Sequence, residues 1–273
     1  MKLPFWKQNN NNTAWADAIK NIRIITVWSP LSTGKSFIAR ALTWSLSKDV
    51  SKVCLADFDM LTPGISLTDG GSLNDIADMV FRGDFTPEVV QSIPSIKENK
   101  RIHFLGGLTD LLLMDLLTPQ VMRDLVQALA DTYLTVIDTG RELNLSATLA
   151  ALDHADLVVV PVVKQWHCVR HTRRYLTFLQ NEMRMDISRM RLIVNEGYPG
   201  DLSVEEMEEI LQFPIEGTLK RFPDLNGNTF PKSVVGLVKT VLGNSKNNQM
   251  KGGRLFDGNG KLAPGNIPAA TAK

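Results

Sequence analysis

A Gly-Lys-Ser triplet, Gly34–Ser36, is the part of this chain whose residue types and spacing point most directly to chemistry. It follows a β-branched apolar run, Ile22–Trp28, and opens a helix-forming segment. In a strand, turn and helix of this kind, backbone N–H groups and the helix N-terminus bind phosphate oxygens, Lys35 neutralises the outer phosphates and Ser36 holds Mg²⁺. The phosphate-loop pattern also asks for a glycine where this chain has Ser29, so the motif is incomplete.

Three aspartates at the ends of apolar segments supply the carboxylates that such a loop needs. Asp57 and Asp59 close the second apolar run, and Asp138 closes a later one. The carboxyl ends of parallel strands meet at one edge of a sheet, where ligands bind. Mg²⁺ prefers oxygen ligands, and a second carboxylate can orient an attacking water. We therefore expect Ser36, Asp57 and Asp138 on the metal side of the site. The candidate catalytic residues are Lys35, Asp59 and Asp138.

The elements that must position these residues alternate along the chain between short apolar strands and helical patterns. The expected strands are Ile22–Trp28, Val53–Asp57, Ile102–Leu105, Tyr133–Asp138, Leu157–Val162, Arg191–Asn195 and Pro214–Leu219. Helices are expected at about 36–47, from Thr118-Pro119 to about Ala130, and over Val204–Leu211. Ser203 and Glu206 form a capping box at the start of the last helix. Continuous apolar strands that alternate with helices predict an α/β fold: a doubly wound, mostly parallel sheet with helices on both faces.

The composition is that of an ordinary globular protein with two polar ends. Of the 273 residues 44% are apolar, and the net charge is +1, so no global field attracts nucleic acid or anionic lipid. Residues 1–18 and 244–273 are predicted to be flexible tails around one nucleotide-binding domain at 19–243. Cys54 and Cys168 predict no disulfide framework, and Cys54 is expected in the core. Without a long apolar run or a basic amphipathic tail, no membrane anchor is expected and the expected location is cytoplasmic.

Taken together, these segments resemble the ParA/MinD family of deviant-Walker ATPases, and within it the MinD-like branch used in pilus-assembly localisation (CpaE/TadZ). The resemblance spans about Ile22 to Val241 and lies in the order and spacing of SPLSTGKS, the Asp-Phe-Asp after the second strand, FRGDFTPEVVQSI, IDTGRELN, ALDHADLVVVPV, LIVNEG and FPIEGTLKRFPDLNGNTFP. It implies the doubly wound fold, ATP or ADP bound with Mg²⁺, and a face-to-face homodimer that encloses two nucleotides.

The resemblance also implies roles for individual positions. Lys35 and Ser36 match the phosphate lysine and the Mg²⁺ hydroxyl. Asp59 matches the switch aspartate that positions water, and Asp138 matches the Walker B aspartate. Asn195 matches the asparagine that reads the adenine edge, and the segment 219–223 would line the other side of the base. The implied nucleotide-binding residues are Ser32, Thr33, Gly34, Lys35, Ser36, Phe37, Asn195, Lys220 and Phe222.

One departure from the family pattern bears on activity. The family carries a lysine just after the first motif position, which reaches the partner's nucleotide across the dimer; this chain has Pro30 there, followed by Leu31 and Ser32. Proline supplies neither the charge nor a backbone donor. Three hypotheses stay open: an ATP-dependent switch that positions a larger assembly such as a pilus or secretion machine, a non-hydrolysing scaffold that dimerises without ATP, and a tyrosine-kinase-like protein. The third is disfavoured because Leu61 stands where that class carries arginine. Whether ATP is hydrolysed is left open.

Two polar clusters fall on one expected helix. A basic patch would suit nucleic-acid phosphates, although a solvated helix face is the favoured interpretation. Its members are Lys164, Arg170, Arg173 and Arg174. His167, Cys168 and His171 have a spacing that zinc can use, but no further ligand follows at a suitable distance, so they are interpreted as surface polar residues. A protein partner or cargo is expected, and nothing in the sequence identifies it.

Overall fold

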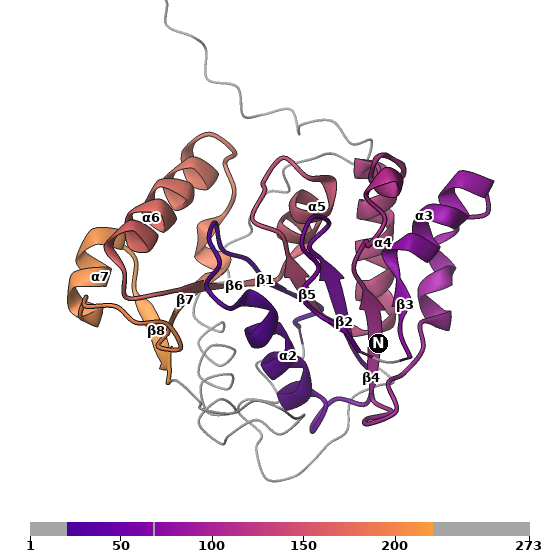
Figure 1. Ribbon diagram of the computed structural model, residues 1–273, viewed down its shortest axis with the longest axis horizontal. Coiled ribbons are helices and arrows are strands. Elements are labelled where there is room, and N and C mark those ends of the chain that lie inside the picture. The colour runs from indigo at the N-terminus through magenta and orange to yellow at the C-terminus, as the bar shows by residue number, and fades with distance from the viewer. Residues whose placement is uncertain (1–20, 68, 221–273) are drawn as a thin grey trace, which may run out of the picture.

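Parallel strands make up the central sheet of the computed structural model, which describes residues 21–67 and 69–220 (Figure 1). The eight strands lie in the order β3-β4-β2-β5-β1-β6-β7-β8, and each neighbouring pair is parallel. Their bounds are β1 Ile24–Val27, β2 Val53–Phe58, β3 Gly71–Ser72, β4 Ile102–Gly106, β5 Leu134–Thr139, β6 Leu157–Val162, β7 Met190–Asn195 and β8 Ile215–Leu219. The central position of β1, β2 and β5 brings the ends of the three site-bearing strands together.

Helices cover both faces of the sheet. The α-helices are α2 Lys35–Leu46, α3 Leu73–Arg82, α4 Pro119–Thr132, α5 Ser146–His154, α6 Trp166–Asn181 and α7 Val204–Leu211, and the short 3-10 helices are η1 Pro87–Ser92, η2 Leu111–Leu116 and η3 Ile187–Arg189. Of these, α2 packs into the core on one face, and α3 to α7 contribute to the core on the other (Figure 1). Successive strand residues such as Ile24 and Ile25 point into opposite cores, which explains why the strands are continuously apolar.

The predicted fold class is confirmed, and every predicted strand is present with ends shifted by at most two residues. The N-terminus of α4 also follows the prediction, because the Thr118 hydroxyl accepts a hydrogen bond from the Val121 N–H at 3.3 Å and Pro119 opens the helix. The capping box of α7 is confirmed as well. The short strand β3 and helix α3 were not predicted; α3 opens with a capping box in which aspartate replaces the usual glutamate.

Some expectations concern residues outside the described ranges. Both tails, most of the 219–223 segment and the base-side residue Phe222 belong to this group. Within the described ranges, Cys54 is buried in the core as predicted. No helix in these ranges combines the length and apolar character that crossing a bilayer requires.

Candidate phosphate and metal site

The site lies at the carboxyl edge of the sheet, where β5 separates β1 from β2. Asp138 near the end of β5 is in register with Val27 on one side and with Asp57 on the other. The loop that links β1 to α2 begins directly after Val27, at the same edge of the sheet as the two aspartates. Sheet order therefore brings together residues that are about eighty positions apart in the chain.

The loop enters α2 through a glycine that the local geometry requires. Gly34 has φ of +86°, in the left-handed region, and a Cβ there would lie 2.5 Å from the side-chain nitrogen of Asn195. The helix that follows has no acidic residue in its first turn. Its free N–H groups and the positive end of its dipole therefore form a site suited to an anion.

Asn195, at the end of β7, holds this loop in place. Its Nδ2 donates to the Thr33 carbonyl at 2.9 Å, and its Oδ1 accepts from the Gly197 N–H at 2.9 Å. A side-chain amide has two N–H donors and two acceptor lone pairs, so one of each is left over. Asn195 thus has a structural role that the sequence did not reveal, beside the implied contact with a base.

Lys35 is almost fully buried at the start of α2, with a relative exposure of 8%. Burial lowers the pKa of Lys35 below its ordinary value, while the carboxylates of Asp138 and Asp59 act in the opposite direction. The guanidinium of Arg141 lowers the pKa of Lys35 a little further. A buried lysine ammonium at a helix N-terminus is placed to meet a multiply charged anion.

Asp138 is buried and its carboxylate is poorly satisfied. Neither oxygen makes a well-aligned hydrogen bond within the described residues, although the Ser36 hydroxyl and Lys35 lie near enough to favour the charged form. Burial, with a smaller effect from Asp57, raises the pKa of Asp138 to about 8. A buried carboxylate without partners, next to a hydroxyl and a phosphate-type loop, fits a Mg²⁺ site.

Asp57 and Asp59 instead hold the segment that follows β2. The oxygens of Asp57 accept from the N–H groups of Asp59 and Ile65, both at 3.0 Å, and burial raises the pKa of Asp57 to about 6. Asp59 accepts from the N–H groups of Leu61 and Thr62 at 3.2 and 2.9 Å, and from the Thr62 hydroxyl at 3.0 Å. Asp57 is expected to bind the metal and Asp59 to position water. Both carboxylates also anchor the loop after β2, so any such role would have to be compatible with these hydrogen bonds.

Two glycines outside the predicted set show how tightly this segment packs on the site. A Cβ on Gly64 would lie 2.6 Å from the Ser36 Oγ, and a Cβ on Gly140 would lie 3.4 Å from an oxygen of Asp59. The loop after β2 thus packs against the expected Mg²⁺ hydroxyl of Ser36, and the start of the loop after β5 lies close to Asp59. Gly140 falls within the IDTGRELN segment of the family resemblance and Gly64 lies outside the quoted segments, and the spacing of neither predicts these contacts.

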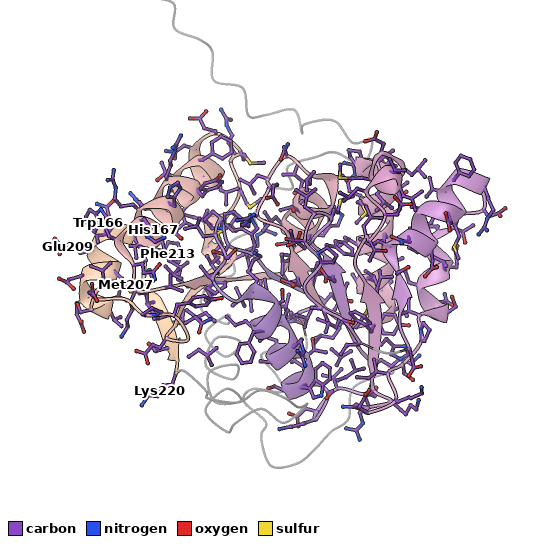
Figure 2. All side chains as sticks on the ribbon, in the orientation of Figure 1. Trp166, His167, Met207, Glu209, Phe213 and Lys220 are labelled. Carbon is purple, nitrogen blue, oxygen red and sulfur yellow. The ribbon has the colours of Figure 1, made fainter. Side chains whose placement is uncertain are left out.

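The remaining predicted binding residues are spread around the loop. Ser32 is exposed, Thr33 is buried, and Phe37 packs partly buried against the α2 core. Lys220 is exposed just beyond β8, whose last residue pairs in register with Asn195 (Figure 2).

The predictions for α6 need correction. Cys168 is buried at 1% exposure, whereas His167 and His171 are exposed, because residues i and i+4 share a helix face that i+1 does not. No group of three metal-ligating His, Cys, Asp or Glu side chains occurs in the described ranges. The basic patch is also smaller than expected, since Lys164 pairs with Glu196 at 2.6 Å and Arg173 donates to the Leu211 carbonyl at 3.0 Å.

The parallel sheet, the loop entering α2 and the aspartates at the strand ends together form an α/β fold with a candidate phosphate site at one edge. Solved structures of ParA and MinD ATPases have the same fold. The ParA family ATPase from Chlorobium tepidum TLS is 19% identical, with a TM-score of 0.63 over 84% of this chain and 95% of that one. The cell division ATPase MinD of Pyrococcus furiosus is 19% identical, with a TM-score of 0.61 over 82% of this chain and 97% of that one.

A third similar structure is a putative plasmid partition protein (BB_S35) from Borrelia burgdorferi B31 bound to AMPPNP, which is 21% identical, with a TM-score of 0.59 over 82% of this chain and 97% of that one. At such identities the likeness shows the fold alone. No protein-family model matches the chain, and no curated protein matches it.

Proposed function

We propose that this protein is a Mg²⁺-dependent ATP/ADP-binding switch of the ParA/MinD type, a homodimer that acts in the cytoplasm to position a larger assembly. The observation that carries the proposal is the buried, unsatisfied carboxylate of Asp138 beside Lys35 and Ser36. An unpaired buried carboxylate is costly unless a cation compensates it. A pilus or secretion machine is the assembly we favour, by resemblance to the CpaE/TadZ branch.

In this proposal the chain's own residues bind and orient the phosphates. The N–H groups at the start of α2 and the ammonium of Lys35 neutralise phosphate oxygens, and Ser36 and Asp138 would hold Mg²⁺, which supplies positive charge to the outer phosphates. Asn195 keeps the loop in shape and has an N–H left for a base. Two proteins of the same fold have such ligands: BB_S35 was solved with AMPPNP, and MinD from Pyrococcus horikoshii OT3 with Mg-ADP.

The loop after β2 is the segment we propose as the moving part. It is held by Asp57 and Asp59 and lies against Ser36 through Gly64. A change in what Ser36 binds would therefore change the packing of this loop directly. Order and disorder of loops around phosphate and Mg²⁺ are a common means of switching.

A second candidate is a scaffold that binds nucleotide without hydrolysing it. Pro30 is buried, and Leu31 packs against the apolar core, so neither offers a charge to a partner's nucleotide. The carboxylate of Asp59, the expected water-positioning group, already accepts three hydrogen bonds from its own loop. Both observations favour weak or absent turnover over fast hydrolysis.

Nucleotide affinity and turnover, measured with and without Mg²⁺ and alongside solution mass, test the proposal. We expect the native protein to bind fluorescent ATP and ADP analogues, and Lys35→Ala to lose binding. Asp138→Asn should lose the dependence on Mg²⁺, whereas Asp115→Asn, at an exposed aspartate, should behave as native. No binding by the native protein would refute the switch. Turnover that disappears in Lys35→Ala would refute the scaffold, and Pro30→Lys tests whether the missing lysine limits turnover.

A further inference from the structure

The exposed face of α6 combines basic and aromatic side chains that the nucleotide site does not use. The helix contains no acidic residue along its sixteen positions. Its exposed residues include Trp166, His167, Arg170, His171, Arg174 and Phe178. Trp166 and Phe178 are 56% and 44% exposed, so this face presents aromatic as well as cationic side chains. Figure 2 shows Trp166 and His167 on the same side of the molecule as α7.

The two exposed arginines on this face form no ion pair within the part of the chain that the structure describes. Arg170 stacks over the Trp166 ring at 5.8 Å, and neither it nor Arg174 forms an ion pair with any described residue. The nearby Lys164 and Arg173, by contrast, are engaged with other groups. Two arginine guanidiniums are therefore available to bind a carboxylate from outside.

A cavity of about 480 Å³ adjoins Arg174, between α6 and the loop 142–144. Leu143, Tyr175 and Phe178 provide apolar walls, and His171 and Arg174 line the same space. The one carboxylate in the lining, Glu142, lies 3.7 Å from the Arg141 guanidinium, so its charge is partly matched. The cavity is large enough for an aromatic or aliphatic side chain, with cations at its side for a neighbouring acid.

The charges around the cavity favour a short acidic peptide over a nucleic acid as its ligand. Helix α7 packs against α6 and carries Glu205, Glu206 and Glu209, all exposed. A long polyanion that followed α6 would meet this negative helix, whereas a short segment centred on Arg174 would not. A phosphate backbone also has no group that fills an apolar cavity.

We propose that α6 and the loop 142–144 form a docking site for a short acidic segment of a partner protein with an aromatic or aliphatic anchor residue. The anchor fills the cavity beside Phe178, and flanking carboxylates pair with Arg174 and Arg170. The site adjoins the segment after Asp138, because Glu142, which lines the cavity, also influences the ammonium of Lys35. The peptide-binding test contains no nucleotide, so its result does not depend on whether the protein binds ATP or ADP.

Fluorescence anisotropy of the full chain with defined probes tests this site. The main probe is a labelled peptide with several glutamates around one phenylalanine. Two matched probes replace the phenylalanine by serine or the glutamates by glutamine, and a fourth is a labelled duplex DNA. We expect the main probe to bind roughly tenfold or more tightly than either matched peptide, since each loses the anchor or the charge-assisted pairs.

Variants locate the binding surface. Arg174→Glu should weaken the main probe by roughly tenfold or more, because it replaces an attractive charge by a repulsive one. Phe178→Ser should remove the preference for phenylalanine over serine. The control is Arg82→Glu at another exposed arginine, on α3 near the opposite edge of the sheet, and this variant should bind as native. Three results would overturn the proposal. The main probe could fail to bind, or Arg174→Glu and Arg82→Glu could weaken it equally. Arg174→Glu could also weaken binding of the duplex DNA without weakening binding of the peptide.

Discussion

Replacing Asn195 tests how the phosphate loop is held. The side chain joins the end of β7 to the loop through the Thr33 carbonyl and receives the Gly197 N–H, both at 2.9 Å. Asn195→Ala removes both hydrogen bonds. Asn195→Asp keeps an acceptor for Gly197 but faces the Thr33 carbonyl with a second acceptor in place of a donor.

The expected loss follows from the burial of the two partners. The bond to Thr33 is buried, so its carbonyl would lose a partner away from water, at about 1–3 kcal/mol. The bond to Gly197 is only partly buried, and water can replace it, so it adds about 0.5–1 kcal/mol. We expect Asn195→Ala to lower the free energy of unfolding by about 1.5–4 kcal/mol, and Asn195→Asp by more at neutral pH.

Urea unfolding of the ligand-free protein measures this directly, and the affinity for a fluorescent ADP analogue reports the loop itself. Asn181→Ala, on the exposed end of α6, is the control, because Asn181 makes no side-chain hydrogen bond within the described residues. Affinity should fall in both Asn195 variants and stay native in the control. If Asn195→Ala unfolded within about 0.5 kcal/mol of the native protein, the tie between β7 and the loop would not matter and the reasoning would be wrong.

Three further predictions concern the site and the core beneath it. Burial raises the pKa of Asp138 to about 8, so the folded protein retains a proton that the unfolded chain releases; ligand-free stability should therefore fall as pH rises from about 4 to about 8, and Asp138→Asn should flatten that slope in thermal melts. A slope unchanged in the variant would contradict the assignment. Gly64→Ala would place a methyl group 2.6 Å from the Ser36 hydroxyl and should cost about 1–3 kcal/mol in urea unfolding, whereas Gly71→Ala, with 3.8 Å of clearance, should cost less; similar losses would show that this contact is not restrictive. Tyr133→Phe removes the hydroxyl that donates to a buried carbonyl of η1 at 2.9 Å and should destabilise by about 1–2 kcal/mol without changing nucleotide affinity, and an affinity change would contradict the separation of core and site.

Local patterns were enough to predict the fold class and the turn that leads into α2. Apolar runs such as Leu157–Val162 mark buried strands regardless of their neighbours, and Thr118 with Pro119 marks a helix start within four residues. The Gly34–Ser36 triplet likewise marks the start of α2, because Gly34 adopts the left-handed conformation just before the helix. Helix α3 was missed because aspartate stood in place of the usual capping glutamate and the strand before it has only two residues.

The sequence by itself determined which side chains are available at the site: a lysine, a serine and aspartates at strand ends. Only the tertiary structure decided how they are used, because partners such as Asn195 and Thr33 are 162 residues apart and meet only once the strand order is set. Packing buries the Asp138 carboxylate with no well-aligned hydrogen bond to any described residue, and it engages Asp57 with the loop after β2. Burial and unpaired hydrogen-bonding groups are properties of packing, so no spacing along the chain could have assigned them.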